Sequence, residues 1–332
     1  MTIISPETLC AGITAALESS STSPENAASV ARALTLAEID GKKGHGLSRV
    51  PSYAGQAKSG KVQGMVSPSF STPKPGVLAI DAGHGFAYPA FDLMLDELPK
   101  MASSQGIAMA GIYRSHHYGV AGHHVEKAAD QGMVALLFGN TPAAMAPWGG
   151  KTGLFGTNPI AFAAPIAGQP PLVIDLATSK VARGNIMAAA QRGEDIPEGW
   201  ALDAMGQPTT NAKSALGGTM VPLGDAKGAA LALMIEVLAA ALTGAGFGYE
   251  ATSFFDAEGD YPNVGQLMLM IDPGAMPLVS GEGFAERMAA MAQLITDDGA
   301  RLPGSGRMAK RKAAEKGLEV NDAAWQAALD LA

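Results

Sequence analysis

Apolar and polar positions follow two different periods along the chain, and the change of period separates helical ends from an α/β middle. Near the N-terminus, two stretches with helical spacing each follow a Ser-Pro-Glu triplet, at residues 5–7 and 23–25. A capping serine, a proline at the first helical position and an acid in the first turn are typical of helix starts. These signals predict two helices, the second of which runs to about Ile39.

A turn is predicted next, because Gly41 and Gly44 follow the second helix closely. Glycine is the residue that most readily ends a helix and reverses the chain. The turn is expected to deliver His45 to the start of a further helical stretch that runs through Tyr53 and Gln56.

The middle of the chain begins after a Pro- and Ser-rich crossing at residues 67–75. Short apolar runs between turn residues then predict strands, with a helix at 89–101; the strands are expected at residues 77–81, 107–113, 134–138, 160–164, 172–175 and 267–271. From residue 281 the spacing is helical again, and the helical stretch from Arg307 is rich in Lys and Arg. We therefore expect an α/β sheet domain covered by helical segments from both ends of the chain.

Composition and charge exclude several classes of function. The chain has 332 residues, 47% of them hydrophobic, which is enough for a large core. Its formal net charge is −8 and it has no long run of Lys or Arg, so neither nucleic acid nor a membrane surface is expected as a partner. The single cysteine, Cys10, forms no intrachain disulfide, and the first residues lack a signal-peptide pattern. These features predict a cytoplasmic protein.

The longest apolar stretch lies at residues 228–242 and is interrupted by Glu236. It is shorter than the ~20 residues that a membrane span needs. We expect instead a helix that is buried on most of its faces.

A dinucleotide-binding fingerprint is the first chemical motif to consider, because a glycine loop follows the predicted strand at 77–81. The loop reads Gly-His-Gly-Phe-Ala-Tyr at residues 83–88, so Tyr88 stands where the third glycine is needed for close packing of the helix. The motif therefore fails, and any nicotinamide cofactor would bind without a Rossmann fold.

Four of the six histidines lie within residues 116–124. Two zinc-binding histidines on a helix are four residues apart, whereas these pairs are six to eight apart, with no cysteine nearby and no carboxylate before Glu126. We therefore predict no metal site. A strand that ends near Tyr113 and a helix that follows instead place backbone N–H groups where a phosphate or carboxylate binds well.

The segment 38–49 is the richest in titratable groups. His45 and Arg49 are four residues apart, so on a helix they would share one face. An imidazole can deliver a proton near neutral pH, and a guanidinium can bind a carboxylate at two points. Alternatively, His45 caps the helix and Arg49 pairs with Asp40 or Glu38, and the segment alone does not decide between the two interpretations.

Six blocks, in this order, resemble the malate and L-lactate dehydrogenase family that is distinct from the Rossmann-type enzymes of those names. The resemblance covers nearly the whole chain, and its blocks lie at residues 41–49, 115–119, 150–165, 174–179, 196–203 and 228–246. It implies a non-Rossmann α/β fold that binds a nicotinamide cofactor, and a homodimer that acts on a small carboxylate. It also implies a helical substrate and dimerisation region at 1–75, a cofactor-binding domain at 76–280, and C-terminal helices at 281–332 that pack back on the N-terminal region.

The resemblance assigns roles to individual residues. His45 is the implied proton donor, and Arg49 and Thr157 are expected to hold the substrate carboxylate. The implied cofactor-binding residues are His117, Tyr118, Gly119, Val120, Ala121, Asp175, Leu176, Ala177, Lys227, Arg301, Leu302, Pro303 and Gly304.

Within the family, residues 238–247, 265–267 and 301–304 are most similar to reductases of Δ1-piperideine-2-carboxylate and Δ1-pyrroline-2-carboxylate. This similarity implies an NADPH-dependent reduction of a cyclic imine to an L-amino acid, with NADH as the alternative cofactor. A 2-hydroxy-acid dehydrogenase of the malate, lactate or ureidoglycolate type is the alternative function. A ligand-binding homologue with impaired catalysis is the second alternative.

Two positions of the catalytic region depart from the imine reductases. Gly44 stands where a serine is expected before the histidine, and Asn185 stands where an acid is expected. If serine and acid relay charge to the histidine, this chain lacks that relay. For the 2′-phosphate of NADPH, Arg301, Arg307 and the basic residues 310–312 are candidates, and a solvated helix face is the alternative for the last three.

Overall fold

The computed structural model describes residues 1–277 and 283–332. The expected domain boundary between residues 280 and 281, and the expected start of helical spacing at Gly281, lie outside the described residues. The helix α9 (Phe284–Asp297) follows this gap.

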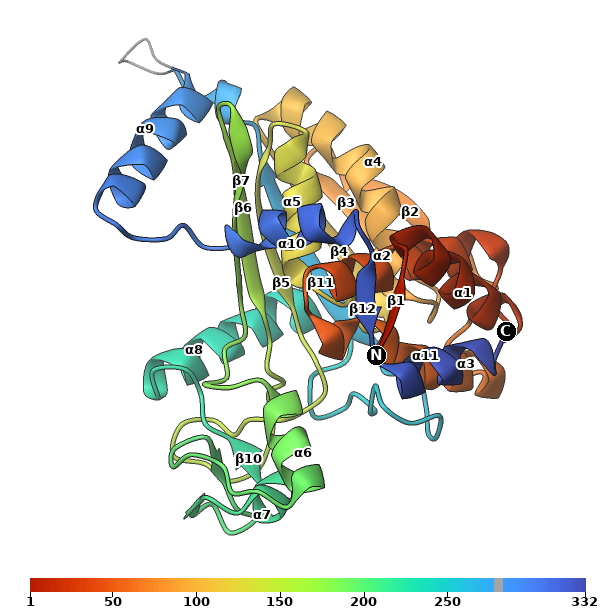
Figure 1. The fold of residues 1–332 in the computed structure, drawn as a ribbon. Helices are drawn as coiled ribbons and strands as arrows, with labels where there is room; N and C mark the ends of the chain where they lie inside the picture. The colour runs from red at the N-terminus through yellow and green to blue at the C-terminus, as the bar shows by residue number, and fades with distance from the viewer. Residues whose placement is uncertain (278–282) are drawn as a thin grey trace.

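A seven-stranded mixed sheet forms the centre of the described chain, in the order β2-β3-β4-β11-β5-β6-β7 (Figure 1). Its strands are β2 (Ser69–Lys74), β3 (Val77–Asp81), β4 (Ile107–Ser115), β5 (Val134–Gly139), β6 (Ile160–Ile166), β7 (Gln169–Leu176) and β11 (Val264–Ile271). Only β3 and β4 pair in parallel among these described strands. All six predicted strands are confirmed, whereas the prediction of a crossing at 67–75 is wrong. That segment forms the edge strand β2, which a periodicity search misses because all six residues are exposed.

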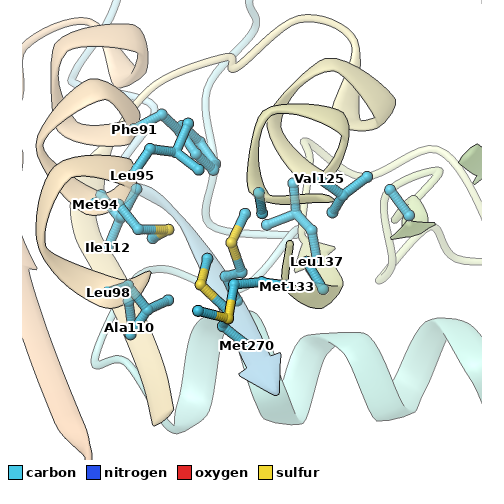
Figure 2. Packing of buried hydrophobic residues seen from close by; sticks show 14 of the residues in the cluster. Phe91, Met94, Leu95, Leu98, Ala110, Ile112, Val125, Met133, Leu137 and Met270 are labelled. Atoms are coloured by element: carbon cyan, nitrogen blue, oxygen red, sulfur yellow. The ribbon is translucent and has the colours of Figure 1, made fainter. Parts of the chain in front are cut away.

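Helices α4 (Ala87–Gln105) and α5 (Ala121–Asp130) cover one face of the sheet. Figure 2 shows the core between them, where Phe91 and Met94 of α4 and Val125 of α5 lie over Ile112 and Met270 of the strands. This core fixes the position of β4 and of the helix α5 that follows it.

The opposite face carries a helix that changes its pitch. Helix α8 (Ala226–Ile235) continues as a π-helix (Glu236–Ala241), and Ile235 and Ala239 pack on Phe138 and Leu267 of the sheet. The prediction that this segment is buried on most faces is wrong, because one side exposes Leu231, Leu233, Met234, Val237 and Leu242. No helix in the described residues is long and apolar enough to cross a membrane.

The two ends of the chain meet beside the sheet (Figure 1). Both predicted helix starts are confirmed: the side chains of Ser5 and Ser23 accept hydrogen bonds from the N–H groups of Thr8 and Asn26, and the second helix ends at Ile39. The elements here are β1 (Thr2–Ile4), α1 (Pro6–Glu18), α2 (Pro24–Ile39), α3 (Val50–Ser59), α10 (Gly306–Ala314), β12 (Leu318–Val320) and α11 (Asp322–Leu329). Strand β1 pairs with β12, and α11 packs on α1. The division of function among the three regions stays a prediction.

A smaller lobe lies below the sheet in Figure 1. It contains α6 (Arg183–Arg192), β8 (Ala201–Leu202), β9 (Pro208–Thr209), α7 (Ala212–Leu216) and β10 (Thr219–Met220). Met145, Phe155, Ile186 and Ile196 form its own apolar cluster. A short 3₁₀ turn, η4 (Pro273–Ala275), follows β11 at the far end of the sheet.

Candidate active site

The segment between α2 and α3 consists of two 3₁₀ turns, η1 (Lys43–His45) and η2 (Leu47–Arg49). Gly46 separates them with a non-helical backbone (φ −107°, ψ −134°), and a Cβ there would lie 2.6 Å from Oε1 of Glu38. Glu38 is buried and accepts a hydrogen bond from the N–H of Leu47 at 2.8 Å, and burial raises its pKa. The expectation that His45 and Arg49 share one helical face is therefore wrong. A buried carboxylate, rather than a continuous helix, shapes this segment.

His45 faces a second imidazole. Its Nδ1 lies 3.2 Å from Nε2 of His117, and the two rings are nearly parallel, at 15° with centroids 5.1 Å apart. Burial, followed by the positive charge of Arg49, lowers the pKa of His45 to about 4. His45 is therefore neutral near pH 7 in the ligand-free site.

Arg49 is 9% exposed and has no acidic partner in the described residues. Its Nε donates to the carbonyl of Gly44 at 2.7 Å, and Nη1 is buried without a hydrogen-bond partner there. The alternative that Arg49 pairs with Glu38 or Asp40 is wrong, since both carboxylates bind other groups. A desolvated guanidinium with a free N–H is poised for a ligand anion.

An aromatic wall stands beside this guanidinium, and sequence reasoning missed it. The ring of Phe255 lies 4.4 Å from the Arg49 guanidinium carbon, and Phe254 lies 5.1 Å from the ring of His117. An ion pair of 2.9 Å between Asp256 and the buried Lys61 ties their loop to the turn that follows α3. The only sequence signal was a Phe-Phe pair in an aperiodic loop more than two hundred residues from Arg49.

Thr157 lies in the turn that precedes β6. Its N–H donates to the hydroxyl of Thr141 at 3.0 Å, and its carbonyl accepts from the N–H of Thr178. Its own hydroxyl makes no hydrogen bond in the described residues, so it is free for a ligand. The next residue, Asn158, is held by the buried carboxylate of Glu236 at 2.9 Å.

Three of the predicted cofactor segments converge at the start of α5. The N–H of Gly122 donates to Oδ2 of Asp175 at 2.9 Å, which joins the segment 117–121 to the end of β7. A Cβ on Gly304 would lie 2.8 Å from the carbonyl of Val173, so the end of the segment 301–304 lies against the same strand. Leu176 is 51% exposed at this edge and offers apolar surface that a cofactor ring can cover.

Two of the predicted site residues make no contact with the groups described above. Asn185 is exposed on α6 in the smaller lobe, and Lys227 is exposed in the first turn of α8. Neither side chain makes a hydrogen bond or ion pair with a described residue.

A charge cluster lies between α2, α5 and α10, and we define it as Asp40, His123, Glu126, Arg307 and Arg311. Arg311 bridges Asp40 and Glu126, both at 2.8 Å, Arg307 reaches Glu126 at 2.7 Å, and His123 reaches Asp40 at 3.0 Å. The alternative of a solvated basic face is therefore wrong for Arg311.

The neighbours of Arg311 differ from it. Lys310 donates to the carbonyl of Asp40 at 2.9 Å, whereas Lys312 is exposed. Arg307 is already paired, whereas Arg301 and Lys312 are exposed and have no ion-pair partner in the described residues.

The other two histidines of residues 116–124 have separate partners. Nε2 of His116 lies 2.6 Å from Oε1 of Gln56, and Nε2 of His124 lies 2.8 Å from the carbonyl of Tyr118. Within residues 1–277 and 283–332, no group of three or more His, Cys, Asp or Glu is arranged to hold a metal ion.

The chain is similar to known proteins along nearly its whole length. A family model described as malate/L-lactate dehydrogenase matches residues 4–328. The (2R)-3-sulfolactate dehydrogenase (NADP(+)) of Chromohalobacter salexigens is 49% identical over 314 residues, which is 93% of this chain and 92% of that one. The Δ1-pyrroline-2-carboxylate/Δ1-piperideine-2-carboxylate reductase of Pseudomonas putida is 41% identical over 302 residues, with coverage of 89% and 86%.

Among solved structures, the crystal structure of Δ1-piperideine-2-carboxylate reductase from Pseudomonas syringae pvar. tomato superposes with a TM-score of 0.93. It is 35% identical in sequence and covers 100% of both chains.

Proposed function

The chain belongs to the malate/L-lactate dehydrogenase family of NAD(P)-dependent oxidoreductases, and from this premise we propose that it moves hydride between NADP(H) and C2 of a small carboxylate bound to Arg49. The family resemblance and the α/β fold expected from the sequence are thereby confirmed. The observation that carries the proposal is the buried, unpartnered Nη1 of Arg49. A carboxylate would satisfy it with a charge-assisted hydrogen bond.

His45 is the proposed proton donor to the keto oxygen or imine nitrogen. In the ligand-free site the charge of Arg49 helps to lower the pKa of His45. A substrate carboxylate on Arg49 offsets that charge and raises the pKa of His45, because opposite charges favour the protonated form. Substrate binding and proton supply are thus linked at these two residues.

The cofactor is proposed to lie along residues 117–121, 175–177 and 301–304, which converge at one edge of the sheet. When bound, it supplies the hydride. Arg301 has no ion-pair partner in the described residues, which supports contact with a 2′-phosphate and hence NADPH over NADH. The NADP-dependence of the 49% identical relative supports the same preference.

Two substrate classes are candidates. We place a 2-hydroxy carboxylate with a second acidic group first, since the sulfolactate dehydrogenase is more similar in sequence than the imine reductases, 49% against 41%. Lys42 supports this choice, because its carbonyl accepts a hydrogen bond from the N–H of His45 at 2.8 Å and its positive charge also lowers the pKa of His45. A cyclic imine comes second, supported by the apolar wall of Phe254 and Phe255. This order reverses the preference expected from the sequence.

Purified protein mixed with NADPH or NADH and one substrate at a time tests the proposal. The substrates are sulfopyruvate, oxaloacetate, pyruvate, Δ1-pyrroline-2-carboxylate and Δ1-piperideine-2-carboxylate. Fastest oxidation of NADPH with sulfopyruvate supports the first class, and fastest oxidation with an imine supports the second. Heat stabilisation by NADPH without turnover of any substrate would contradict both and support a ligand-binding homologue.

We also propose a homodimer. Large exposed apolar patches are rare on monomeric proteins and usually mark an interface. One side of the helix at residues 226–242 forms such a patch, which a second copy would bury; its residues are Leu231, Leu233, Met234, Val237 and Leu242. Light scattering of the wild type should give twice the monomer mass, and Val237→Glu should lower it. A monomeric wild type would contradict the proposal.

A further inference from the structure

We propose that Tyr53 is a positioning residue which, through His117, determines the ring nitrogen of His45 that carries the proton. The inference rests on the proposed function, in which His45 serves the substrate. It goes beyond that function by supplying a relay that neither Gly44 nor Asn185 provides.

The relay is a continuous row of buried side chains. Nδ1 of His45 meets Nε2 of His117 at 3.2 Å, Nδ1 of His117 is hydrogen-bonded to the hydroxyl of Tyr53, and that hydroxyl lies 3.1 Å from the hydroxyl of Tyr88. Tyr53 is 0%, Tyr88 3% and His117 5% exposed. Solvent therefore has little access behind His45, and these three side chains set its hydrogen bonding.

The positions at which a serine and an acid were expected do not reach this row. Gly44 has no side chain, and a Cβ there would meet nothing within 4 Å. Asn185 is exposed on α6 and contacts none of the relay residues through a hydrogen bond. The task of orienting His45 therefore falls to His117 and its tyrosines.

The relay carries no charge. Burial raises the pKa of Tyr53 to about 12 and that of Tyr88 well above its usual value, so both hydroxyls keep their hydrogens. Burial, with Arg49 next, lowers the pKa of His117 well below its usual value, so this imidazole is neutral. Each member therefore has one hydrogen to donate.

Counting donors gives the relay a direction. Within the described residues the hydroxyl of Tyr88 has one partner, Tyr53, so its hydrogen points there. Tyr53 then donates to Nδ1 of His117, and His117 donates from Nε2 to Nδ1 of His45. The opposite direction would leave the Tyr88 hydrogen buried without an acceptor, which is unfavourable because an unsatisfied buried donor loses its hydrogen bond to water.

The consequence for His45 is a fixed tautomer. Because Nδ1 accepts from His117, the single proton of neutral His45 stays on Nε2 and presents an N–H on the side of the ring away from His117. A second proton, taken from solvent, would have to bind Nδ1. His45 would then donate to His117, and every hydrogen bond of the relay would reverse its direction. The relay therefore keeps His45 neutral until a carboxylate on Arg49 favours the charged form.

Kinetics provide the first test, with Tyr53→Phe and the matched variant Tyr88→Phe. Each removes one buried hydroxyl from the same row, so a merely structural role predicts equal losses. We expect Tyr53→Phe to lower kcat roughly 30-fold with KM and NADPH affinity nearly unchanged, since orientation of a catalytic imidazole contributes to the reaction step. Tyr88→Phe should lower kcat only about threefold, because Tyr53 can still donate to His117. Equal losses in the two variants would overturn the proposal.

Nitrogen NMR of the whole, ¹⁵N-histidine-labelled protein provides a second test that needs no turnover. His45→Asn identifies the His45 signals at pH 7.5 without substrate. The wild type and Tyr88→Phe should show one neutral tautomer with the proton on Nε2, and Tyr53→Phe should show a mixture. A wild-type proton on Nδ1, or an unchanged tautomer in Tyr53→Phe, would overturn the relay. Absence of turnover in the wild type would instead contradict only the proposed function.

Discussion

Two arginines that lie beside the same segment of the chain meet opposite surroundings. Arg311 of the charge cluster reaches Asp40, which ends α2, and also Glu126, so its charge is matched by two carboxylates. Arg49, which ends the second 3₁₀ turn, has a buried Nη1 without a partner in the described residues. Only nine residues separate Asp40 from Arg49.

The difference separates a structural charge from a binding charge. A buried ion that is paired within the chain contributes to the fold, and removing one member leaves the others uncompensated. A buried ion without a partner costs stability, and a ligand of opposite charge recovers that cost on binding. We therefore expect the two arginines to respond to mutation in opposite ways.

The largest effect is expected at the charge cluster. Arg311→Met removes the cation shared by Asp40 and Glu126, which are 4% and 6% exposed. Unfolding in urea should show a loss of roughly 3 kcal/mol, because breaking a buried pair strands the remaining charge. Lys312→Met is the control, since its side chain is exposed and should change stability little. Equal stability of the two variants would remove the cluster from its structural role.

At the active site we expect a loss of substrate binding without a loss of stability. Arg49→Gln should raise KM for the carboxylate substrate about 100-fold, equivalent to ~2.7 kcal/mol of lost binding, because a charge-assisted contact disappears. Its unfolding free energy should stay the same or rise, since an uncompensated buried charge is removed. Steady-state kinetics and urea unfolding check both parts, and a destabilised variant with unchanged KM would make Arg49 structural.

Much of this arrangement is readable from local sequence. The caps at Ser5 and Ser23 and the six apolar strands of the sheet were predicted because their signals lie within a few residues. His45 and Arg49 were chosen for their chemistry, although the helix that was to join them is broken at Gly46. At Gly46 the chain packs so closely against Glu38 that a Cβ would not fit, and periodicity does not record such contacts.

What could not be predicted depends on distant partners. Arg311 and Lys312 are neighbours in one basic run, yet only the former meets acids contributed by α2 and α5. Phe255 reaches Arg49 from a loop far along the chain. The exposed apolar side chains at residues 231–242 were also missed, because an almost continuous apolar run does not show which of its residues face the sheet.

The smallest expected effect is a difference in acid sensitivity between the two regions. Hydrogen bonds from His123 and Arg311 hold the pKa of Asp40 at about 2 despite its burial. Its folded pKa lies below the unfolded value of ~4, so its contribution of about 2 kcal/mol is present above pH 4 and is lost as the pH falls toward 2. His45, with a pKa of about 4, is depressed from 6.5, so protons favour the unfolded chain and stability falls between about pH 6.5 and 4. Urea unfolding across pH should therefore show that His45→Asn makes the loss of stability in the higher window less steep, while the buried His116, His117 and His124 still contribute to it. Arg311→Met should reduce the loss in the lower window. If either substitution flattens both windows, the two regions titrate as one and the contrast between them fails.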